Sequence, residues 1–502
     1  MAFMSGEERA LAAALARVGY ANPFLPERID AERVALGGEF VRVDRVWSVR
    51  TDRAVQNPNV ARLGERAATL AARLRERLAA GTEPSEPDRA LYEDVVLYLL
   101  YTRYEDDLLD LVVKAGASEA ARVAFYERFR TDFQHFLARP GADPGHLFAC
   151  LFQIRRAFHH IFWHVVGGSM SMARLRAAVW QSVFTHDMRR YRRALYERMD
   201  DVTTLIVGPS GTGKEVVARA IGLSRYIPFD QRAQRFAAHF GDLFHPLNLS
   251  ALSPTLIESE LFGHRRGAFT GALQDRAGWL ETCEPFGTVF LDEIGDVDPA
   301  IQVKLLRVLQ ARTFQRLGDT KPLLFRGKIM AATNRDLARE IQAGRFREDF
   351  YYRLCSDIIA TPSLAEQLRE SPDELPNLIL FLARRLVGDE EAEALADEVQ
   401  AWIEEHLGRT YPWPGNVREL EQCVRNVLIR GEYRPPTARD GHPEGQLAAA
   451  LRAGELTADQ LLARYCALVY AETRSYQETA RRLGLDRRTV KSKVDQYKTE
   501  GK

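Results

Sequence analysis

The sequence has few features of secreted, membrane-spanning or disulfide-stabilised proteins. It contains five cysteines in 502 residues and no Cys-x-x-Cys pair, which argues against a disulfide framework and against a zinc ribbon. No run of about 18 apolar residues occurs, and acidic residues interrupt the apolar positions near the N-terminus. Neither secretion nor a membrane span is therefore indicated, and we expect a cytoplasmic protein.

An excess of charge of one sign is also lacking. Lys and Arg number 69 together, as do Asp and Glu, so the formal net charge is +0. Any contact with nucleic acid must then come from a local patch and not from the charge of the whole chain. The length of the chain and its hydrophobic fraction of 46% are typical of a folded protein with three or four domains.

Changes in residue pattern predict the organisation of the chain. Short β-rich runs, such as TTLIV at 203–207, TVFL at 288–291 and KIMAAT at 328–333, alternate with helical stretches, which is typical of a parallel sheet with crossover helices. We therefore expect an α/β core with a helical lid, an all-α N-terminal domain before it and an all-α domain after it. The expected segments are 1–173 (helical), 174–365 (α/β core), 366–432 (helical lid), 433–455 (linker) and 456–502 (helical tail).

A glycine-rich turn follows the first of these strands. GPSGTGKE, residues 208–215, fits the G-x-x-x-x-G-K core of a phosphate-binding P-loop between a strand and a helix. Its glycines let backbone N–H groups close around phosphate oxygens, and the following helix offers its positive end. Lys214 is placed to reach the terminal phosphates. The residues predicted to bind ATP here are Gly208, Ser210, Gly211, Thr212, Gly213, Lys214 and Glu215.

Acidic and amide residues after later strands predict the rest of a hydrolytic site. Glu215 stands where a Ser or Thr hydroxyl would ordinarily bind Mg²⁺, so a carboxylate elsewhere must hold the metal. Asp292 is suited to position the Mg²⁺, and Glu293 is suited to polarise the attacking water. Asn334 follows another strand, where its amide can orient that water. The two acids can also simply cap a turn, but their position downstream of a P-loop disfavours this.

Two arginines lie six residues apart in GRFREDFYYRL. Arg347 and Arg353 can be ordinary surface charges. They are also suited to reach a nucleotide bound in a neighbouring subunit and to stabilise the charge of the transition state. On that interpretation catalysis requires a ring of subunits.

The stretch ELFGHRRGAFTGAL, residues 260–273, holds a single aromatic residue among small ones. Gly267 and Gly271 flank Phe269 and free the backbone to turn sharply. One interpretation is an ordinary turn whose ring folds back onto the core, since single apolar residues on surfaces are common. The other is a hydrophobic contact presented to a partner. These residues by themselves favour the ordinary turn.

Seven motifs in this order resemble one family. GPSGTGKE, ESELFGHRRGAFTGA, FLDEIGD, QVKLLRVLQ, ATNRDL, FREDFYYRL and YPWPGNVREL, spread over roughly residues 174–432, look like the AAA+ domain of bacterial sigma-54-dependent transcriptional activators. The GAFTGA element distinguishes that family from other AAA+ proteins. The resemblance implies an ATPase with ATP and Mg²⁺ as cofactors, which assembles from dimers into hexamers. It also implies action on sigma-54 RNA polymerase from enhancer DNA, with hydrolysis opening the promoter complex.

The resemblance also implies roles for single residues. Asn248 would restrain Glu293, Asn334 would be the sensor I residue, and Arg418 would be the sensor II arginine of the lid. Arg347 and Arg353 would act on the neighbouring subunit. The contact with sigma-54 would be made by Gly267, Ala268, Phe269, Thr270, Gly271 and Ala272.

The chain departs from the family pattern in three places. Pro209 replaces a usual glutamate, which should stiffen the P-loop without removing a phosphate ligand. Arg265 and Arg266 replace a more acidic lead-in to the GAFTGA loop. The segment 224–246 is longer than usual, and the sequence gives it no role.

The C-terminal tail predicts a helix-turn-helix. Two short helices should meet at Leu483-Gly484-Leu485, with the turn at Gly484 and a cap at Asp486. Basic residues outnumber acidic ones in this segment, which forms a local positive patch on a neutral chain. It resembles the Fis-type domain that ends these activators and binds enhancers as a dimer; a solvated basic helix is the alternative. The residues predicted to face DNA are Arg487, Arg488, Thr489, Lys491 and Ser492.

The front segment 1–173 shows no known sensory domain. FHHIFWH at 158–164 places His160 and His164 one helical turn apart, and acids of YEDDLLD at 104–110 could complete a metal site from a facing helix. A helical module that binds a ligand or a protein is preferred, because such clusters are more often core packing and solvated faces.

Two other functions remain open at this level. One is a DNA-binding regulator that changes state when it binds nucleotide and does not need to hydrolyse it. Such a regulator has no use for Glu293, Arg347 and Arg353. The other is a AAA+ protein that remodels a different substrate, which leaves the GAFTGA loop and the basic tail without a use.

Overall fold

The computed structural model describes residues 2–43, 57–114, 122–137, 139, 141–239, 241, 243–435, 447, 450, 451, 454 and 456–500. These residues form two compact units, Met1–Glu421 and Gln422–Lys502. Most of the predicted linker 433–455 lies outside the described residues. None of the helices in the described ranges is long and apolar enough to cross a membrane.

The front of the chain is helical, as predicted. Its first helix begins with a capping box, in which the Ser5 side chain accepts from the Glu8 N–H and the Glu8 carboxylate accepts from the Ser5 N–H. The last of these helices continues without a break through position 173 into the predicted core. The helices are α1 (Gly6–Tyr20), α2 (Pro26–Leu36), η1 (Gly37–Glu39), α3 (Pro58–Ala79), α4 (Glu86–Lys114), α5 (Tyr126–Leu137), α6 (Pro144–His164) and α7 (Met170–Phe184).

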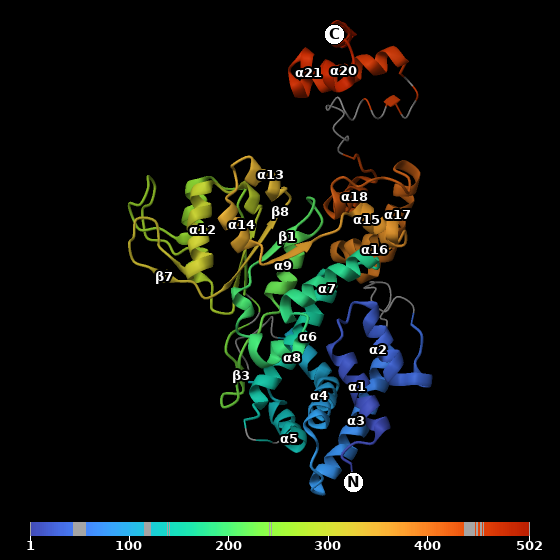
Figure 1. The fold of residues 1–502 in the computed structure, drawn as a ribbon, viewed down its shortest axis with the longest axis vertical. Helices are drawn as coiled ribbons and strands as arrows, with labels where there is room; N and C mark the ends of the chain where they lie inside the picture. Colours follow the sequence, from blue (N-terminus) through green and yellow to red (C-terminus); the bar gives the residue numbers. More distant parts are fainter. Residues whose placement is uncertain are drawn as a thin grey trace. The chain divides into compact units, whose positions relative to one another are not determined.

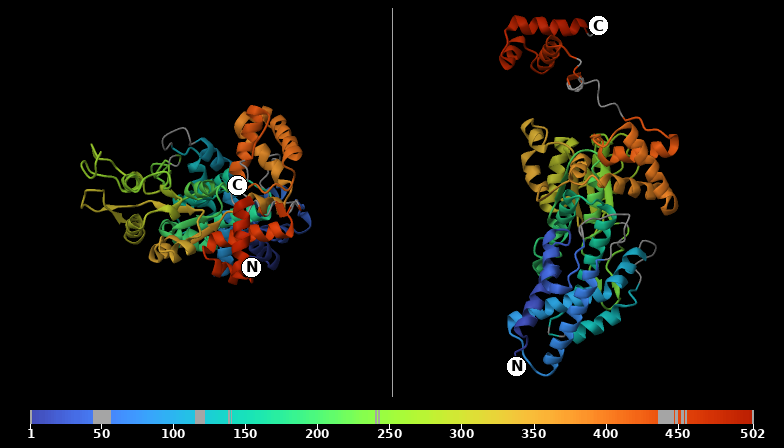
Figure 2. Two further views of the ribbon diagram at one scale, coloured as in Figure 1. Left: turned by 90° about the horizontal axis from the view of Figure 1, so that it is seen from above. Right: turned by 90° about the vertical axis from the view of Figure 1, so that its right-hand side faces the viewer.

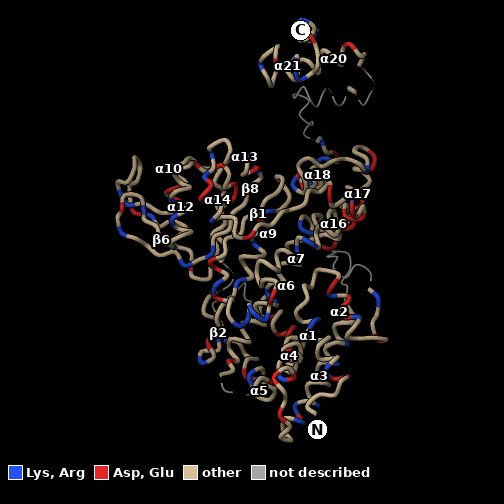
Figure 3. Tube along the Cα trace, viewed as in Figure 1, with Lys and Arg blue, Asp and Glu red and all other residues tan. Residues whose placement is uncertain are grey.

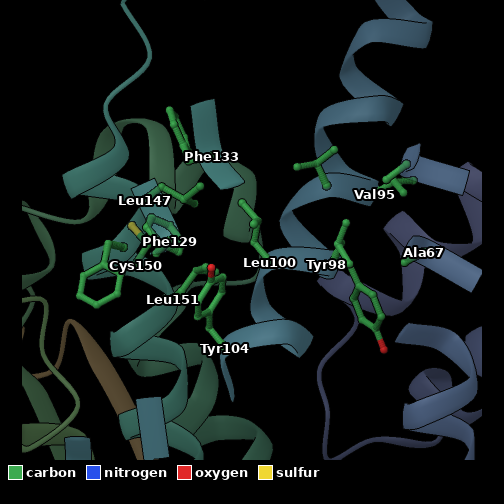
Figure 4. Close-up of a cluster of buried hydrophobic side chains, with 14 of the residues drawn as sticks. Ala67, Val95, Tyr98, Leu100, Tyr104, Phe129, Phe133, Leu147, Cys150 and Leu151 are labelled. Carbon is green, nitrogen blue, oxygen red and sulfur yellow. The ribbon is translucent and has the colours of Figure 1, made fainter. Parts of the chain in front are cut away.

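Helix α4 lies in the middle of the front helices and buries residues on two sides. In Figure 4, Val95 and Tyr98 of α4 point toward Ala67 of α3, while Leu100 points toward Leu147 and Leu151 of α6. All of these side chains are buried. Lys and Arg are interspersed with Asp and Glu along these helices (Figure 3). The burial of the apolar side chains between the helices is the main force that holds them together.

A five-stranded parallel sheet forms the centre of the α/β core, which confirms the predicted fold class. Its strand order is β4-β5-β8-β1-β9. The strands predicted from TTLIV, TVFL and KIMAAT are three of its members. All six residues of β8 are buried, and its four central residues are apolar, as expected for a strand covered on both faces. The strands are β1 (Thr204–Val207), β4 (Phe244–Asn248), β5 (Thr288–Asp292), β8 (Lys328–Thr333) and β9 (Asp357–Ala360).

Helices and short strands surround this sheet (Figures 1 and 2). The helices α15, α16 and α17 of the lid are grouped beside the sheet in both figures. The remaining elements of the core are α8 (Met188–Arg190), η3 (Tyr191–Leu195), η4 (Met199–Asp201), α9 (Lys214–Gly222), β2 (Phe229–Asp230), β3 (Arg235–Phe236), α10 (Pro254–Phe262), α11 (Trp279–Thr282), η5 (Ile294–Asp296), α12 (Pro299–Ala311), β6 (Thr313–Phe314), β7 (Leu323–Leu324), α13 (Leu337–Gln342) and α14 (Glu348–Leu354). The lid consists of α15 (Leu364–Glu370), α16 (Glu374–Val387), α17 (Asp389–His406) and α18 (Asn416–Arg430).

The long segment 224–246 joins the core to the front helices. Within it, β2 and β3 pair as an antiparallel hairpin. Phe229 of this hairpin lies 4.5 Å from Tyr126 and 4.7 Å from Phe148, measured between ring centroids, and Phe236 lies 4.2 Å from Phe152. The hairpin therefore completes the hydrophobic core of the front helices, a role that the sequence did not reveal.

We expect Phe229→Ala to destabilise the protein by about 3–5 kcal/mol, because the change removes a buried ring from an aromatic cluster and leaves a cavity. The free energy of unfolding is measured by denaturant titration. The control is Leu324→Ala on β7, whose side chain is 57% exposed and whose loss should cost no more than about 0.5 kcal/mol. Equal stability of the two variants would mean that the hairpin does not share the front core.

Helix α6 also holds the end of α9, the helix that follows the P-loop. The Gln153 side chain donates to the Ser224 carbonyl at 3.0 Å, and the Arg156 guanidinium donates to the Leu223 and Arg225 carbonyls. These are carbonyl groups at the C-terminal end of α9, where helices lack partners of their own and where positive charge is favourable. Burial, together with the nearby Arg225, lowers the pKa of Arg156 to about 9.

The C-terminal part of the second unit is helical, and two of its helices meet where the sequence predicts the turn of a helix-turn-helix. The described helices of this tail are α20 (Ala458–Thr473), α21 (Tyr476–Leu483) and α22 (Arg487–Glu500). Gly484 ends α21 with φ of 64°, and the Asp486 carboxylate accepts from the Arg488 N–H at 2.7 Å, as the sequence predicts for the turn and the cap. Cys466, Ala480, Val490 and Val494 form its small core.

Candidate functional site

The P-loop connects β1 to α9 in a conformation that glycine permits. Gly208 has φ of 152° and Gly211 has φ of 79°. A Cβ atom at Gly208 would lie 2.1 Å from Thr361 Oγ1, and one at Gly211 would lie 2.2 Å from the Gly415 carbonyl oxygen. Helix α9 starts at Lys214 without a side-chain cap, so its first N–H groups are available to an anion in the loop.

Lys214 lies beneath this loop with its side chain buried. Its Nζ donates to the Gly208 carbonyl at 3.1 Å and to the Pro209 carbonyl at 3.2 Å. Burial lowers the pKa of Lys214, while the nearby carboxylates of Glu293 and Asp292 oppose this shift. The ammonium group therefore contacts the P-loop and lies within the electrostatic influence of the two predicted acids.

The ends of three neighbouring strands bring the predicted acids and amides to one edge of the sheet. Asn248 at the end of β4 is in register with Asp292 at the end of β5, and Asn334 directly follows β8. Glu293 adopts a left-handed conformation with φ of 55°, and its Oε2 accepts from the Asn334 N–H at 3.3 Å. Burial and the adjacent Glu293 raise the pKa of Asp292. Such an edge, next to a lysine, suits a divalent cation and an activated water.

The side chain of Asn248 accepts hydrogen bonds from a neighbouring residue, Ser250. Its Oδ1 accepts from the Ser250 N–H at 3.0 Å and from the Ser250 hydroxyl at 2.8 Å. Asn248 forms no hydrogen bond to Glu293 within the described ranges. The expected restraint of Glu293 by Asn248 therefore does not occur in this conformation.

The two predicted trans-acting arginines flank α14 on the surface. Arg347 forms an ion pair with Asp349 through two bonds of 3.0 and 2.7 Å, which raises the pKa of Arg347. Arg353, in the last turn of α14, is exposed. Both guanidinium groups are thus at the surface.

The lid contacts the P-loop through residues on α18 and on the segment after β9. Arg418 Nη1 donates to Ser210 Oγ at 3.0 Å. The hydroxyl groups of Thr212 and Thr361 are 2.7 Å apart.

Glu215 is exposed and pairs with Arg219 at 3.3 Å, one turn along α9. Thr361 and Asn416 are contact residues that the sequence did not single out, although Asn416 lies within the quoted WPGNVREL motif.

The GAFTGA loop is a tight turn between α10 and α11. The Gly267 N–H donates to the Ala272 carbonyl at 2.8 Å, and the Ala272 N–H donates to the Phe269 carbonyl at 3.0 Å. The Phe269 ring is half-buried and packs edge-on against the His264 ring at 5.0 Å between centroids. Thr270 is exposed. In this conformation the ring folds back, as in the ordinary turn that the loop's own residues favour.

Arg265 holds the base of this loop. Its guanidinium forms ion pairs with Asp275 and, at 2.9 Å, with Asp319 on the neighbouring loop between β6 and β7. The Arg265 N–H also donates to the Leu317 carbonyl at 2.9 Å. Arg265 therefore ties the two loops together.

The five residues predicted to face DNA are exposed together on the first turns of α22. They are Arg487, Arg488, Thr489, Lys491 and Ser492. Lys493, by contrast, pairs with Asp459 of α20 and so contributes to packing within the tail. The exposed side chains leave one face of α22 available to a polyanion.

The histidines of α6 have no third metal ligand among the described residues. The rings of His160 and His164 stack at 5.9 Å between centroids. Burial and the nearby Arg156 lower the pKa of His160 to about 2, and burial and Arg219 lower that of His164 to about 4. No group of three His, Cys, Asp or Glu side chains suited to a metal exists in the part of the chain that the structure describes. The metal alternative for the front segment is therefore not supported, because the acids of 104–110 do not join these rings.

Comparison with known proteins agrees with this geometry. Residues 182–359 match the family described as "Sigma-54 interaction domain". This segment is a sigma-54 interaction domain. The P-loop and the parallel sheet lie in the sigma-54 interaction domain, and together with the helical lid, which follows this domain, they form the AAA+ fold.

Curated relatives resemble the sigma-54 interaction domain and its surroundings. The transcriptional regulatory protein ZraR of Klebsiella oxytoca is 40% identical over 305 residues, which are 59% of this chain and 63% of ZraR. The Nif-specific regulatory protein of Azotobacter vinelandii is 44% identical over 230 residues, 46% of this chain and 40% of that protein. The sigma54-dependent transcriptional regulator SfnR of Pseudomonas fluorescens is 41% identical over 266 residues, 50% of this chain and 65% of SfnR. The chain thus spans less than two thirds of the length of each of these relatives.

Among solved structures, NtrX from Brucella abortus in complex with ADP is 23% identical, with a TM-score of 0.40 over 74% of this chain and 80% of NtrX.

Proposed function

We propose that this protein is an ATP-hydrolysing transcription activator that opens promoters bound by sigma-54 RNA polymerase. The observation that carries the proposal is the placement of a P-loop lysine after β1 and of a pair of acids at the end of β5, two strands of one parallel sheet, inside a sigma-54 interaction domain. The names of the relatives, which include a sigma54-dependent transcriptional regulator, support the same function.

The residues of the site fit ATP and Mg²⁺. Backbone N–H groups of the P-loop and the uncapped start of α9 would hold the phosphates, and Lys214 would neutralise the terminal ones. Asp292 would hold the Mg²⁺, which supplies charge neutralisation at the phosphate oxygens. Glu293 takes a proton from the attacking water, and the amide of Asn334 holds that water in line. Asn248 would act on Glu293 after releasing Ser250.

Hydrolysis would require a second copy of the chain. Arg347 and Arg353 lie at the surface, and we propose that they reach the nucleotide of a neighbouring subunit in a ring that grows from dimers to a hexamer. Arg418 would contact the same nucleotide from the lid of its own subunit, where it already contacts Ser210. Positive charge supplied across an interface stabilises the transition state of phosphoryl transfer.

The loop Gly267–Ala272 would deliver the energy of hydrolysis to sigma-54. For this the Phe269 ring must leave His264 and the Arg265 ion pairs must open, so that Phe269 and Thr270 meet the partner. Recruitment would come from the tail, in which Arg487, Arg488, Thr489, Lys491 and Ser492 contact enhancer DNA. The front helices would receive a signal and act on the P-loop helix that they hold.

The test is promoter opening in vitro. With ATP, sigma-54 RNA polymerase and a template that carries an upstream binding site, we expect the full-length chain to produce open complexes, detected by permanganate reactivity of unpaired thymines. Polymerase with the housekeeping sigma factor should give none. ATP turnover without opening would favour a remodeller of another substrate, and opening with a non-hydrolysable ATP analogue would favour a nucleotide-binding switch.

A matched pair of variants isolates the DNA contact in the same assay. Arg488→Ala with Lys491→Ala removes two exposed charges from α22 and should shift the protein concentration needed for opening upward by about tenfold or more. Arg481→Ala removes one charge from α21, where Arg481 is already paired with Glu478, and should have little effect.

A further inference from the structure

The turn before α18 has an unusual backbone conformation, which several hydrogen bonds stabilise. Trp413 and Asn416 both have positive φ, of 47° and 54°, and the Asn416 N–H donates to the Trp413 carbonyl at 2.8 Å. The buried Glu419 accepts from the Gly415 N–H at 2.7 Å and from the Tyr411 hydroxyl at 2.6 Å. A non-glycine residue in the left-handed region is held there by its surroundings, so the position of Asn416 is fixed.

The buried amide of Asn416 joins three elements. Its Nδ2 donates to the Ser210 carbonyl in the P-loop at 2.9 Å, and its Oδ1 accepts from the Leu364 N–H at the start of α15 at 2.9 Å. Asn416 itself is 4% exposed and begins α18. One side chain therefore links the P-loop to the first and last helices of the lid.

The bond to Ser210 determines the orientation of a phosphate-binding group. In a planar trans peptide the carbonyl and the next N–H point in opposite directions. With the Ser210 carbonyl held toward Asn416, the Gly211 N–H points away from the lid. Backbone N–H groups of a P-loop bind phosphate only when they converge on it, so the peptide plane between Ser210 and Gly211 must be set correctly.

We infer that Asn416 is a positioning residue for nucleotide binding: it fixes the Ser210–Gly211 peptide and ties its orientation to the lid. The inference rests on the proposed function, since it requires that the P-loop bind ATP. When the lid moves relative to the sheet, the Asn416 amide carries that movement directly to the phosphate site, independently of the Arg418 side chain.

Substitutions separate the contributions of this residue. Asn416→Asp keeps the acceptor for the Leu364 N–H but replaces the donor to Ser210 with a carboxylate oxygen. Asn416→Gly keeps the positive φ and removes both bonds. The control is Gln367→Glu, which makes the same amide-to-carboxylate change at another buried lid residue, whose Nε2 donates to the Pro362 carbonyl at 3.3 Å.

The measurement is the dissociation constant of a fluorescent ADP analogue, together with KM and kcat for ATP and the melting temperature without nucleotide. We expect Asn416→Asp and Asn416→Gly to raise the dissociation constant and KM by about tenfold, with kcat at saturation within about twofold, since each leaves a P-loop carbonyl without its donor. Gln367→Glu should lower the melting temperature and leave the dissociation constant unchanged.

Two outcomes would overturn the inference: wild-type affinity in Asn416→Gly, or an equal loss of affinity in Gln367→Glu, which would indicate a general effect of lid stability. Asn416→Gly retains the backbone conformation and so provides the test even if Asn416→Asp does not fold. Failure of the wild-type chain to bind the ADP analogue at all would count against the proposed function instead.

Discussion

Lys214→Ala is expected to reduce ATP turnover by about a thousandfold or more, measured as phosphate release at saturating ATP. The ammonium group is buried beside the P-loop, where a charge acts on the terminal phosphates with little screening by water. Alanine leaves no group of comparable charge in that position. Phosphoryl transfer depends mainly on such positioning and charge stabilisation, so the loss should appear in kcat as well as in KM.

The fold should survive this substitution. Lys214 Nζ donates only to the Gly208 and Pro209 carbonyls in the described part of the chain, and Pro209 is exposed, so water can replace the ammonium group there. Lys304→Ala is the control, because Lys304 is a half-exposed lysine paired with Glu258 at 2.8 Å. Turnover by Lys214→Ala within tenfold of the control would contradict the assignment of the nucleotide site.

The parts of this site that the sequence predicted are those encoded locally. A P-loop requires glycines and a lysine at fixed spacing between a strand and a helix, and the apolar runs that end in Asp292 and Asn334 mark strands whose carboxyl ends meet at one edge. The same holds for the tail, where Gly484 and Asp486 determine the turn within a few residues. In each case the physical cause lies within a short window of sequence.

The features that were missed depend on contacts between distant segments. Phe229 contacts Phe236 within its own hairpin, but its position in the front core follows from Tyr126 and Phe148, about 100 and 80 residues earlier. Asn416 gains its role only because the lid closes on Ser210, which precedes it by about 200 residues. The spacing of His160 and His164 suggested a ligand pair, but both rings are half-buried and, among the described residues, no acidic side chain joins them to form a metal site.

The contacts of the front helices with α9, and of the lid with the P-loop, also give the proposed regulation a route to the phosphate site. The front helices share a core with the hairpin at 229–236, and Arg156 and Gln153 hold the end of the helix that starts at Lys214. On the proposed function, a signal received by the front segment would reach the phosphate site through one helix, whose opposite end would bind the nucleotide. The lid contacts the P-loop through Asn416. The unit formed by the P-loop and α9 is thus held at its first end by the lid and at its last end by α6.

Thr270→Ala is expected to leave ATP turnover within about twofold of wild type and to abolish open-complex formation. Thr270 is exposed, and its side chain forms no hydrogen bond in the described residues, so the fold loses nothing when the hydroxyl and one methyl group are removed. The loop lies outside both the P-loop helix that begins at Lys214 and the strand end that carries Asp292 and Glu293, and hydrolysis should proceed. If the tip of the loop is the contact that transmits force to sigma-54, its loss separates hydrolysis from promoter opening.

The matched control is Thr255→Ala, which removes the same group from an exposed position on α10 outside the loop. Permanganate reactivity of the promoter and phosphate release are measured in the same reaction, so that the ratio of opening to hydrolysis is obtained for each variant. A defect confined to the contact with sigma-54 lowers this ratio for Thr270→Ala alone, whereas a defect in the assembly of the ring of subunits lowers hydrolysis too. The two variants make the same Thr→Ala change and differ only in whether the threonine lies in the GAFTGA loop. Equal ratios would therefore mean that this loop does not couple ATP hydrolysis to sigma-54.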